Sequence, residues 1–332
     1  MTAGGRRAVI RGTGASLPER ILTNADLERI VDTSDEWITS RTGIRERRIA
    51  GEDEPMSKFA IGAAEAALRA AGVQASDLDM ILCATVTPDM PIPATACIIQ
   101  DRLQAGNIPA FDLSAGCSGF LYGLAVADRF VASGACDHVL LIGAELLSKF
   151  TDWKDRSTCV LFGDGAGAVV VTAGEAPYGV LSTALHADGS MADFIYVPAG
   201  GTREPASERT VAGRRHFIRM RGNETFKMAV RSMEESAREV LEAAGLQPSD
   251  IDLFIPHQAN RRIIDAVGSR LGLREDQTYV NIERVGNTSA ASIPVALDEA
   301  VGKGLLKRGD NVLFAAFGTG LTWGAALCKW GW

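Results

Sequence analysis

The amino-acid sequence predicts an α/β protein made of two related halves. Apolar runs such as HVLLIGAE, GAVVVT and NVLFAAFG alternate with helix-like stretches such as FLYGLAVADRFVASG. Runs of this kind are typical of strands buried on both faces, so we expect mostly parallel sheets covered by helices. Residues 68–82, LRAAGVQASDLDMIL, recur as LEAAGLQPSDIDLFI at residues 241–255. FGDGAGAVVV from Phe162 is echoed, in the same order, by FGTGLTWGAAL from Phe317, which indicates a duplication.

Each copy of the repeat predicts the same elements: the end of a helix, a Gly that stops it, a Ser-Asp turn and a buried strand. We expect the first half to occupy residues 1–172 and the second half residues 173–332. Within the second half, residues 173–214 are mixed in pattern and rich in Gly, Pro and Ala, so they are predicted to be a connecting segment. A duplicated fold tends to hold its ligand between the halves, where equivalent loops face each other.

The composition excludes several classes of protein. The chain has 332 residues, is 46% hydrophobic and 23% charged, and carries a net charge of −7, which argues against a nucleic-acid binder. It has no apolar run of membrane-spanning length, and the apolar stretch at the N-terminus is too short for a signal peptide. We expect a cytoplasmic protein that binds neither membrane nor nucleic acid.

The six cysteines do not form a metal or disulfide framework. They stand at positions 83, 97, 117, 136, 159 and 328, without a C-x-x-C pair or a histidine at ligand spacing. This pattern predicts no metal site and no disulfide, and five of the cysteines are expected to be small buried packing residues.

Cys117 differs from the other five in its surroundings. It stands in FDLSAGCSGFLYG, between a strand-like run and a helix-like run. The start of a helix stabilises a thiolate, so we expect the pKa of Cys117 to be lowered. The small flanking residues leave room for a tight turn and an acyl group, although close helix packing would favour the same residues.

Two polar loops in the second half contain further candidates. His257 follows the second copy of the repeated strand, whereas the equivalent position in the first half is Ala84. A structural hydrogen bond is the alternative role for a single histidine. Asn287 precedes a Thr-Ser-Ala run that opens a helix, and the alternative here is a helix N-cap. Thr288 or Ser289 could fill that cap and leave the Asn287 side chain free.

Six motifs together resemble one known family. VDTSDEWITSRTGIRERRIA, AGCSGF, FGDGAGAVVV, PHQANRRII, GNTSAAS and FGTGLTWGAAL have the order and spacing found in β-ketoacyl-acyl carrier protein synthase III, an acyltransferase that initiates fatty acid biosynthesis. The resemblance covers nearly the whole chain. It implies the thiolase fold, with duplicated halves in an αβαβα layered arrangement. It also implies a decarboxylative Claisen condensation of a short acyl-CoA with malonyl-acyl carrier protein.

The resemblance implies roles for individual residues. Cys117 would carry the acyl group in a ping-pong reaction, and His257 and Asn287 would stabilise the enolate formed when malonate loses CO₂. The backbone N–H groups of Cys117 and Thr319 would form the oxyanion hole; Thr319 replaces a Gly common in the family. No cofactor is implied, because coenzyme A enters as the substrate thioester.

Substrate and partner contacts are implied in the same way. The coenzyme A contacts would be Trp37, Arg41, Arg156, Asn223 and Asn260, with the adenine between Trp37 and Arg156. A surface anchor remains the alternative for Trp37, and an ion pair for Arg41. Ile92 matches a Phe at the base of the family's acyl pocket, so longer or branched primers are expected.

Acyl carrier proteins are acidic, so a locally basic docking face is expected. Its residues would be Gln258, Arg261, Arg262 and Lys227. The arginines between residues 203 and 221 are either a further docking cluster or part of a solvated loop. The resemblance also suggests a homodimer.

Two other functions remain as alternatives. One is a related acyltransferase or condensing enzyme of secondary metabolism, which would share the fold and the Cys-His-Asn trio. The other is a dinucleotide-binding protein, suggested by GTGASLPE and FGDGAGA. Neither stretch is G-x-G-x-x-G between a strand and a helix, so this reading is disfavoured.

Overall fold

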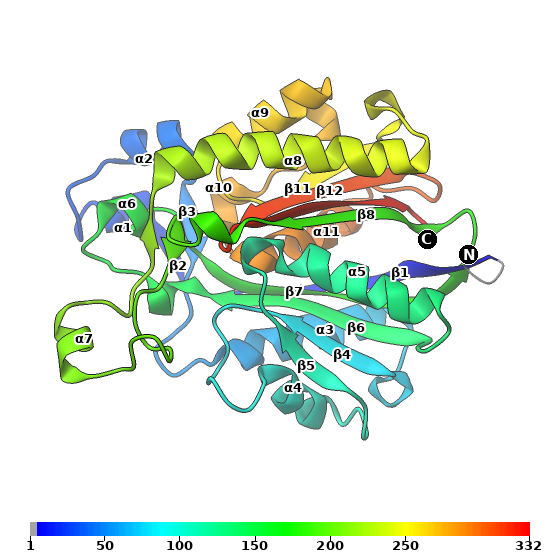
Figure 1. Ribbon diagram of the computed structural model, residues 1–332, viewed down its shortest axis with the longest axis horizontal. Coiled ribbons are helices and arrows are strands. Elements are labelled where there is room, and N and C mark those ends of the chain that lie inside the picture. Colours follow the sequence, from blue (N-terminus) through cyan, green and yellow to red (C-terminus); the bar gives the residue numbers. More distant parts are fainter. Residues whose placement is uncertain (1–4) are drawn as a thin grey trace.

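Two β-sheets and three layers of helices alternate in the computed structural model, which describes residues 5–332 (Figure 1). This is the αβαβα arrangement expected from the sequence. In the part of the chain that the structure describes, no helix is both long and apolar enough to cross a bilayer.

The first sheet combines strands from the first half of the chain. In spatial order these are β1 (Arg6–Ser16), β7 (Asp164–Glu175), β6 (His138–Leu146), β4 (Met80–Ala84) and β5 (Ala110–Leu113). β4 runs parallel to β5 and β6, whereas β7 is antiparallel to both β6 and β1. The sheet is therefore mixed, and the prediction of mostly parallel sheets is wrong.

The second sheet repeats this order with fewer strands. Its members are β8 (Gly179–Ala187), β13 (Thr322–Lys329), β12 (Asn311–Gly318) and β11 (Leu253–Pro256). β11 is parallel to β12, and the other two pairings are antiparallel. Each strand thus corresponds to one of β1, β7, β6 and β4, as a duplication requires.

The repeated segments fold alike in detail. α3 (Met56–Ala71) ends at Gly72 with φ 67°, and α8 (Gly222–Ala244) ends at Gly245 with φ 69°. This left-handed conformation costs glycine little, so the repeated Gly stops both helices. A capping box then joins Gln74 to Asp77 in one copy and Gln247 to Asp250 in the other.

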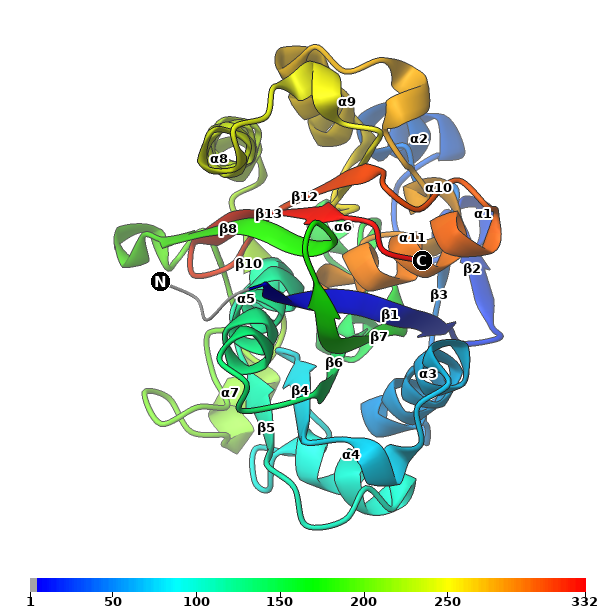
Figure 2. The same ribbon diagram turned by 90° about the vertical axis from the view of Figure 1, so that its right-hand side faces the viewer.

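Helices cover both faces of each sheet. α3 and α4 (Thr95–Leu103) pack on the outside of the first sheet, and α8 and α9 (Arg261–Leu271) on the outside of the second. α5 (Gly119–Ala132) and α11 (Ser292–Gly302) lie between the sheets, in the largest apolar core (Figure 2). Each fully buried Leu, Ile or Phe in these layers contributes roughly 1.5–3 kcal/mol by leaving water.

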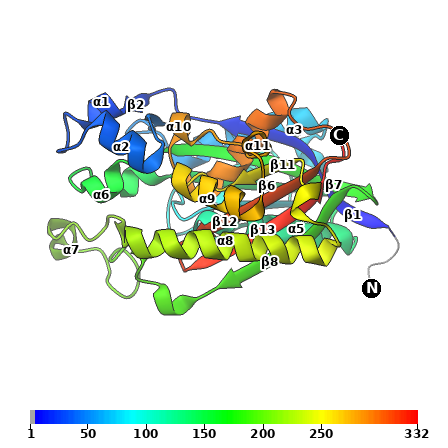
Figure 3. The same cartoon turned by 90° about the horizontal axis from the view of Figure 1, so that it is seen from above.

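Short elements gather at the end opposite the two chain termini (Figure 3). They are α1 (Asn24–Leu27), α2 (Asp35–Thr42), α6 (Arg156–Cys159), α7 (Glu208–Ala212) and α10 (Ile282–Val285), with the pairs β2 (Ile21–Thr23)–β3 (Glu46–Arg48) and β9 (Ile195–Tyr196)–β10 (Arg219–Met220). Residues 188–221, between β8 and α8, include α7 and β9–β10. We call them the cap segment.

The predicted boundary between the halves needs correction. β7 continues to Glu175, past residue 172, because it pairs along its length with β1. Residues 173–214 are not only a connection, since they contain β8, the edge strand of the second sheet. Apart from the turn between β7 and β8, only residues 188–214, which belong to the cap segment, lie outside both sheets.

Candidate active site

Cys117 lies at the start of a central helix. It is the middle residue of a short 3-10 helix, Gly116–Ser118, that leads into α5. Gly116 has φ 55°, and a Cβ there would lie 2.9 Å from Thr319 N and 2.6 Å from Thr319 Cγ2. Only glycine fits this turn. The small residues before Cys117 therefore allow the loop after β12 to come close to it.

The thiol of Cys117 is not acidic. Burial and the nearby Glu145 carboxylate raise its pKa to about 11; the Ser289 side chain and the backbone N–H groups of Cys117 and Thr319 lower it only in part. The prediction of a lowered pKa is therefore wrong, because desolvation of the thiolate outweighs the helix start. The two N–H groups predicted to form an oxyanion hole are thus among the groups that lower this pKa, and their role in binding an oxyanion stays a prediction.

Gly318 provides a test of this arrangement. A methyl group there would lie 2.4 Å from Cys117 N. Gly318→Ala should therefore displace the loop that carries the Thr319 N–H. We expect acylation of Cys117 to slow by roughly 10²-fold or more, as for the loss of one oxyanion-hole donor. Gly302→Ala is the control, since its Cβ would meet nothing within 4 Å. An unchanged acylation rate in Gly318→Ala would argue against this oxyanion hole.

His257 follows β11 and is buried, with 1% of its surface exposed. Its Nδ1 lies 2.6 Å from Ser292 Oγ, which also accepts a hydrogen bond from Gln258 N at 3.3 Å. Burial lowers the pKa of His257 to about 3, so the imidazole is neutral at physiological pH. The sequence did not identify Ser292; its only signal was a small polar residue at the start of the following helix.

Asn287 is held by the backbone around it. Its N–H donates to Leu161 O at 2.9 Å, its carbonyl accepts from Gly163 N at 3.0 Å, and its Oδ1 accepts from Ser289 N at 2.9 Å. Because Oδ1 is occupied, Nδ2 is the end of the amide that can donate elsewhere. Asn287 Oδ1 therefore accepts from a backbone N–H at the start of the next helical turn, which is part of what the alternative N-cap role predicts.

Three cavities form a continuous path past Cys117. The outer cavity measures about 690 Å³, the middle one about 120 Å³ and the inner one about 160 Å³. Outer and middle cavities share lining residues that include Phe226 and Asn260, and middle and inner cavities share Cys117, Phe162 and Ile195. The middle cavity brings together Cys117, His257 and Asn287. The inner one is lined mainly by apolar side chains, among them Val86, Leu147, Phe150 and Ile218.

Several residues predicted to contact coenzyme A lie around the outer cavity. Trp37, Arg41 and Asn260 line it, and the guanidinium groups of Arg41 and Arg156 each lie 4.8 Å from the Trp37 ring centroid. Arg156 already touches the ring, so a base can stack between them only after Arg156 moves.

Two asparagines were also predicted to contact coenzyme A, namely Asn260 and Asn223. The Asn260 amide caps α9 by accepting from Arg262 N, and donates to Arg41 O. Its role in the structure is therefore at least partly a helix cap. Asn223 lies in the first turn of α8, and its side chain is outside the part of the protein that the structure describes.

Two predicted site residues are not where the sequence placed them. Ile92 is 85% exposed and does not line the inner cavity, so within one chain it is not the base of the acyl pocket. Gln258 is fully buried, and its amide bonds to Pro256 O, Tyr279 O and Asn281 N. A buried amide cannot meet a docked protein, so the docking prediction for Gln258 is wrong.

The basic residues predicted for docking differ in exposure and in ion pairing. Arg262 and Lys227 are exposed at the rim of the outer cavity, and Arg262 stacks on Phe226. Arg261 instead points to Asp265 and Glu275, at 2.7 and 3.3 Å. Among the described residues that line this cavity, the exposed basic side chains are Arg262, Lys227 and Arg41.

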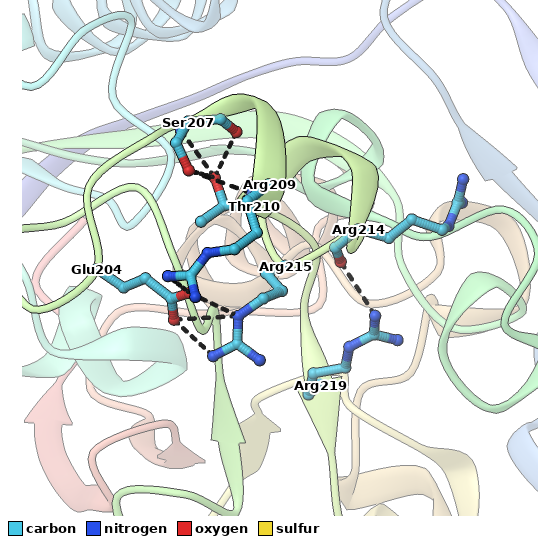
Figure 4. A network of polar contacts seen from close by, with 7 residues as sticks. All are labelled: Glu204, Ser207, Arg209, Thr210, Arg214, Arg215 and Arg219. Carbon is cyan, nitrogen blue, oxygen red and sulfur yellow. Dashed lines mark hydrogen bonds and ion pairs between the residues drawn. The ribbon is translucent and has the colours of Figure 1, made fainter.

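The arginines of residues 203–221 hold the cap segment together. Glu204 lies between Arg209 and Arg215, and Arg219 donates to the backbone carbonyl of Arg214 (Figure 4). Arg214 and Arg219 both pair with Asp152, a nearly buried carboxylate outside the segment. These contacts favour a structural role over docking for this cluster.

Comparisons with known proteins agree with this architecture. A family model for 3-oxoacyl-[acyl-carrier-protein] synthase III matches residues 111–189, and a model for its C-terminal part matches residues 241–330. The β-ketoacyl-[acyl-carrier-protein] synthase III of Caldanaerobacter subterraneus subsp. tengcongensis is 58% identical over 323 residues, 97% of this chain and 98% of that protein.

Solved structures give the same result. The crystal structure of 3-oxoacyl-[acyl-carrier-protein] synthase III from Aquifex aeolicus is 53% identical with a TM-score of 0.90, covering 97% of this chain and all of that one. A priming β-ketosynthase from a polyketide pathway is 36% identical with a TM-score of 0.91, covering 100% and 99%. The chain therefore belongs to the β-ketoacyl-[acyl-carrier-protein] synthase III family of acyltransferases.

Proposed function

We propose that this protein condenses a short acyl-CoA with malonyl-acyl carrier protein through an acyl-Cys117 intermediate, and thereby initiates fatty acid synthesis. The supporting observation is the middle cavity, where Cys117, His257 and Asn287 share one space between an open outer cavity and an apolar inner one. A thioester can enter from the outer side and place its acyl chain beyond the sulfur.

In the first half-reaction, the Cys117 sulfur attacks the thioester carbonyl and coenzyme A leaves. The N–H groups of Cys117 and Thr319 would bind the tetrahedral oxyanion, which is supported by the fact that both residues line the inner cavity beside the sulfur. Trp37 and Arg41 would hold coenzyme A in the outer cavity, which they line.

In the second half-reaction, malonyl-carrier loses CO₂ and the resulting enolate attacks the acyl group. Ser292 Oγ accepts from Gln258 N–H, so its own proton can be donated to His257 Nδ1. The ring proton then lies on Nε2, where it can hydrogen-bond to the enolate oxygen. Asn287 Nδ2 would supply the second donor, and neither donor needs a full charge.

The direct test follows the acyl group. After brief mixing with acetyl-CoA, intact-mass analysis should show one acetyl group on the protein. Malonyl-carrier should then remove it, with release of CO₂ and formation of a 3-oxoacyl-carrier. Removal by water at the same rate would indicate a hydrolase. A related condensing enzyme of secondary metabolism, suggested by the 36% identity to a polyketide β-ketosynthase, would discharge the group to another acceptor instead.

The inner cavity predicts primers larger than acetyl. Its volume of about 160 Å³ exceeds the roughly 10–15 Å³ that one water needs. We expect kcat/KM for isobutyryl-CoA and hexanoyl-CoA to equal or exceed that for acetyl-CoA, because each CH₂ that the cavity buries adds about 0.8 kcal/mol of favourable transfer free energy. Ile218→Trp should narrow the cavity and slow hexanoyl transfer selectively. A strict preference of the wild type for acetyl-CoA would overturn this expectation.

The rim charge predicts how the carrier docks. Arg262→Glu should raise KM for malonyl-carrier by roughly tenfold and leave acylation by acetyl-CoA nearly unchanged, since reversing a rim charge weakens encounter with an acidic partner. Lys307→Glu is the control, because Lys307 precedes β12 at the end remote from Thr319. Equal losses in both half-reactions would show that Arg262 does not act through the carrier.

A homodimer and a cytoplasmic location belong to the same proposal. β5 is an open edge strand, and Phe111 on it is exposed, as are Met90 and Ile92 nearby in the sequence. An open edge strand that carries an exposed aromatic side chain is a surface that a second copy could cover. Light scattering would give the mass in solution.

A further inference from the structure

Glu145 is a buried carboxylate beside the reacting cysteine. It belongs to β6, has no exposed surface, and accepts hydrogen bonds only from uncharged groups. These donors are the hydroxyls of Thr85 (3.3 Å), Thr87 (2.6 Å) and Ser289 (3.0 Å), and the N–H of Val86 (3.2 Å). A buried acid without a basic partner calls for an explanation, because the mechanism above does not use it.

The surrounding hydrogen bonds have a fixed direction. Thr87 Oγ1 accepts from Leu146 N at 2.9 Å, and Thr85 Oγ1 accepts from Thr87 N at 3.0 Å. Both hydroxyls are therefore left to donate their protons to Glu145. Because every neighbour that hydrogen-bonds to Glu145 donates a proton, these bonds stabilise the ionised carboxylate. Burial opposes ionisation and raises the pKa of Glu145 to about 7, so it can take up a proton near neutral pH.

Ser289 joins Glu145 to the sulfur. Its hydroxyl donates to Glu145 Oε1 at 3.0 Å, and Ser289 and Cys117 both line the inner cavity, so the oxygen of this hydroxyl is left to accept a proton from the Cys117 thiol. Its backbone has φ 49°, a left-handed conformation that is unfavourable for serine. Strain of this kind persists where the surroundings enforce it, and often at functional sites.

We propose that Ser289 and Glu145 form a proton relay that takes the thiol proton from Cys117 during acyl transfer. The proton of Cys117 passes to Ser289 Oγ while the proton of Ser289 passes to Glu145. The sulfur electron pair forms the bond to the acyl carbon as the carbon–sulfur bond to coenzyme A breaks. Glu145 ends protonated and the leaving coenzyme A sulfur holds the electron pair, so the charge is unchanged overall.

The relay accounts for a reactive sulfur with a raised pKa. Direct ionisation of Cys117 would place a second anion beside the Glu145 carboxylate in a buried site, which is costly. The relay moves one negative charge from oxygen to sulfur instead of adding another. The titratable groups that face Glu145 are Cys83 on β4 and Cys117, and neither supplies a positive charge.

The relay rests on the proposed function, because it requires that Cys117 be acylated. The test therefore distinguishes failure of the relay from failure of acylation itself. Single-turnover acylation by acetyl-CoA at pH 7 should fall by roughly 10²-fold or more in Glu145→Gln, as for loss of a general base. Alkylation by iodoacetamide at pH 9–10 should be as fast or faster, because the variant removes a negative charge that faces the sulfur. Asp164→Asn, which neutralises another buried carboxylate that accepts from Ser148, controls for loss of a buried acid.

Ser289→Gly gives an independent readout. Glycine adopts φ 49° without strain, so this variant should keep or raise the melting temperature while losing acylation as Glu145→Gln does. The double variant should be no slower than either single one, because both break one chain. Unchanged acylation in Glu145→Gln, or parallel losses of acylation and alkylation, would overturn the relay alone. A wild type that is never acylated on Cys117 would overturn the proposed function together with it.

Discussion

Cys117→Ala should remove the acetyl group that mass analysis detects after mixing with acetyl-CoA. Condensation should fall by roughly 10⁴-fold or more, as when a covalent nucleophile is lost. The reason is structural, because Cys117 supplies the one thiol among the described residues that line the middle and inner cavities. The fold should survive, since Ala fits wherever Cys does.

Cys97→Ala is the matched control. Cys97 is an exposed free thiol on α4, outside the three cavities, so its loss should leave acylation unchanged. If the acetyl group persisted in Cys117→Ala and vanished in Cys97→Ala, the nucleophile would be misassigned. Cys97 is also the one cysteine besides Cys117 that is not buried, so the expectation of five buried packing cysteines holds for four.

His257→Ala should separate the two half-reactions. We expect decarboxylation of malonyl-carrier to slow by roughly 10²–10³-fold, as when an oxyanion donor is removed, while acylation by acetyl-CoA changes much less. Because the pKa of His257 is about 3, its protonation should not appear in the decarboxylation profile between pH 5 and 8. His138→Ala, at the start of β6, is the control.

The same histidine should make stability depend on pH. Its folded pKa of about 3 lies below the ordinary value of 6.5, so the unfolded chain binds more protons between these limits. The free energy of unfolding should therefore fall as pH drops from 6.5 toward 3, and His257→Ala should lack this part of the slope. Equal slopes in both proteins would mean that His257 titrates normally.

The duplication made much of the fold predictable from the sequence. Two copies of one helix–Gly–turn–strand segment require equivalent local structure, and Gly72 and Gly245 show it. Strand direction was not predictable, because β6 and β7 are buried on both faces whether they pair parallel or antiparallel. β8 was missed because its partner, β13, lies far away in the sequence.

The site shows a similar limit. Cys117, His257 and Asn287 stand in loops at strand or helix ends, so sequence patterns and resemblance could identify them. The pKa of Cys117 depends on burial by distant segments, which no local pattern reports. The sequence did not identify Glu145 as a site residue. A single acid at the end of the apolar run HVLLIGAE looks like the exposed end of a strand. Gln258 sits in a polar loop, yet its amide is enclosed by backbone groups from two other loops.

The starts of α5 and α11 meet beside the reacting atoms. A Cβ on Gly119 would lie 3.5 Å from Ala290 Cβ, just before α11. The described residues that line the middle cavity include no Lys or Arg, although a tetrahedral oxyanion and an enolate form there in the proposed cycle. Peptide N–H groups, among them that of Cys117 at a helix start, would then stabilise the tetrahedral oxyanion, whereas the His257 and Asn287 side chains would stabilise the enolate. Alanine replacement leaves every peptide N–H in place, so this contribution would be silent in an alanine scan and detectable only by proline or by backbone amide-to-ester exchange.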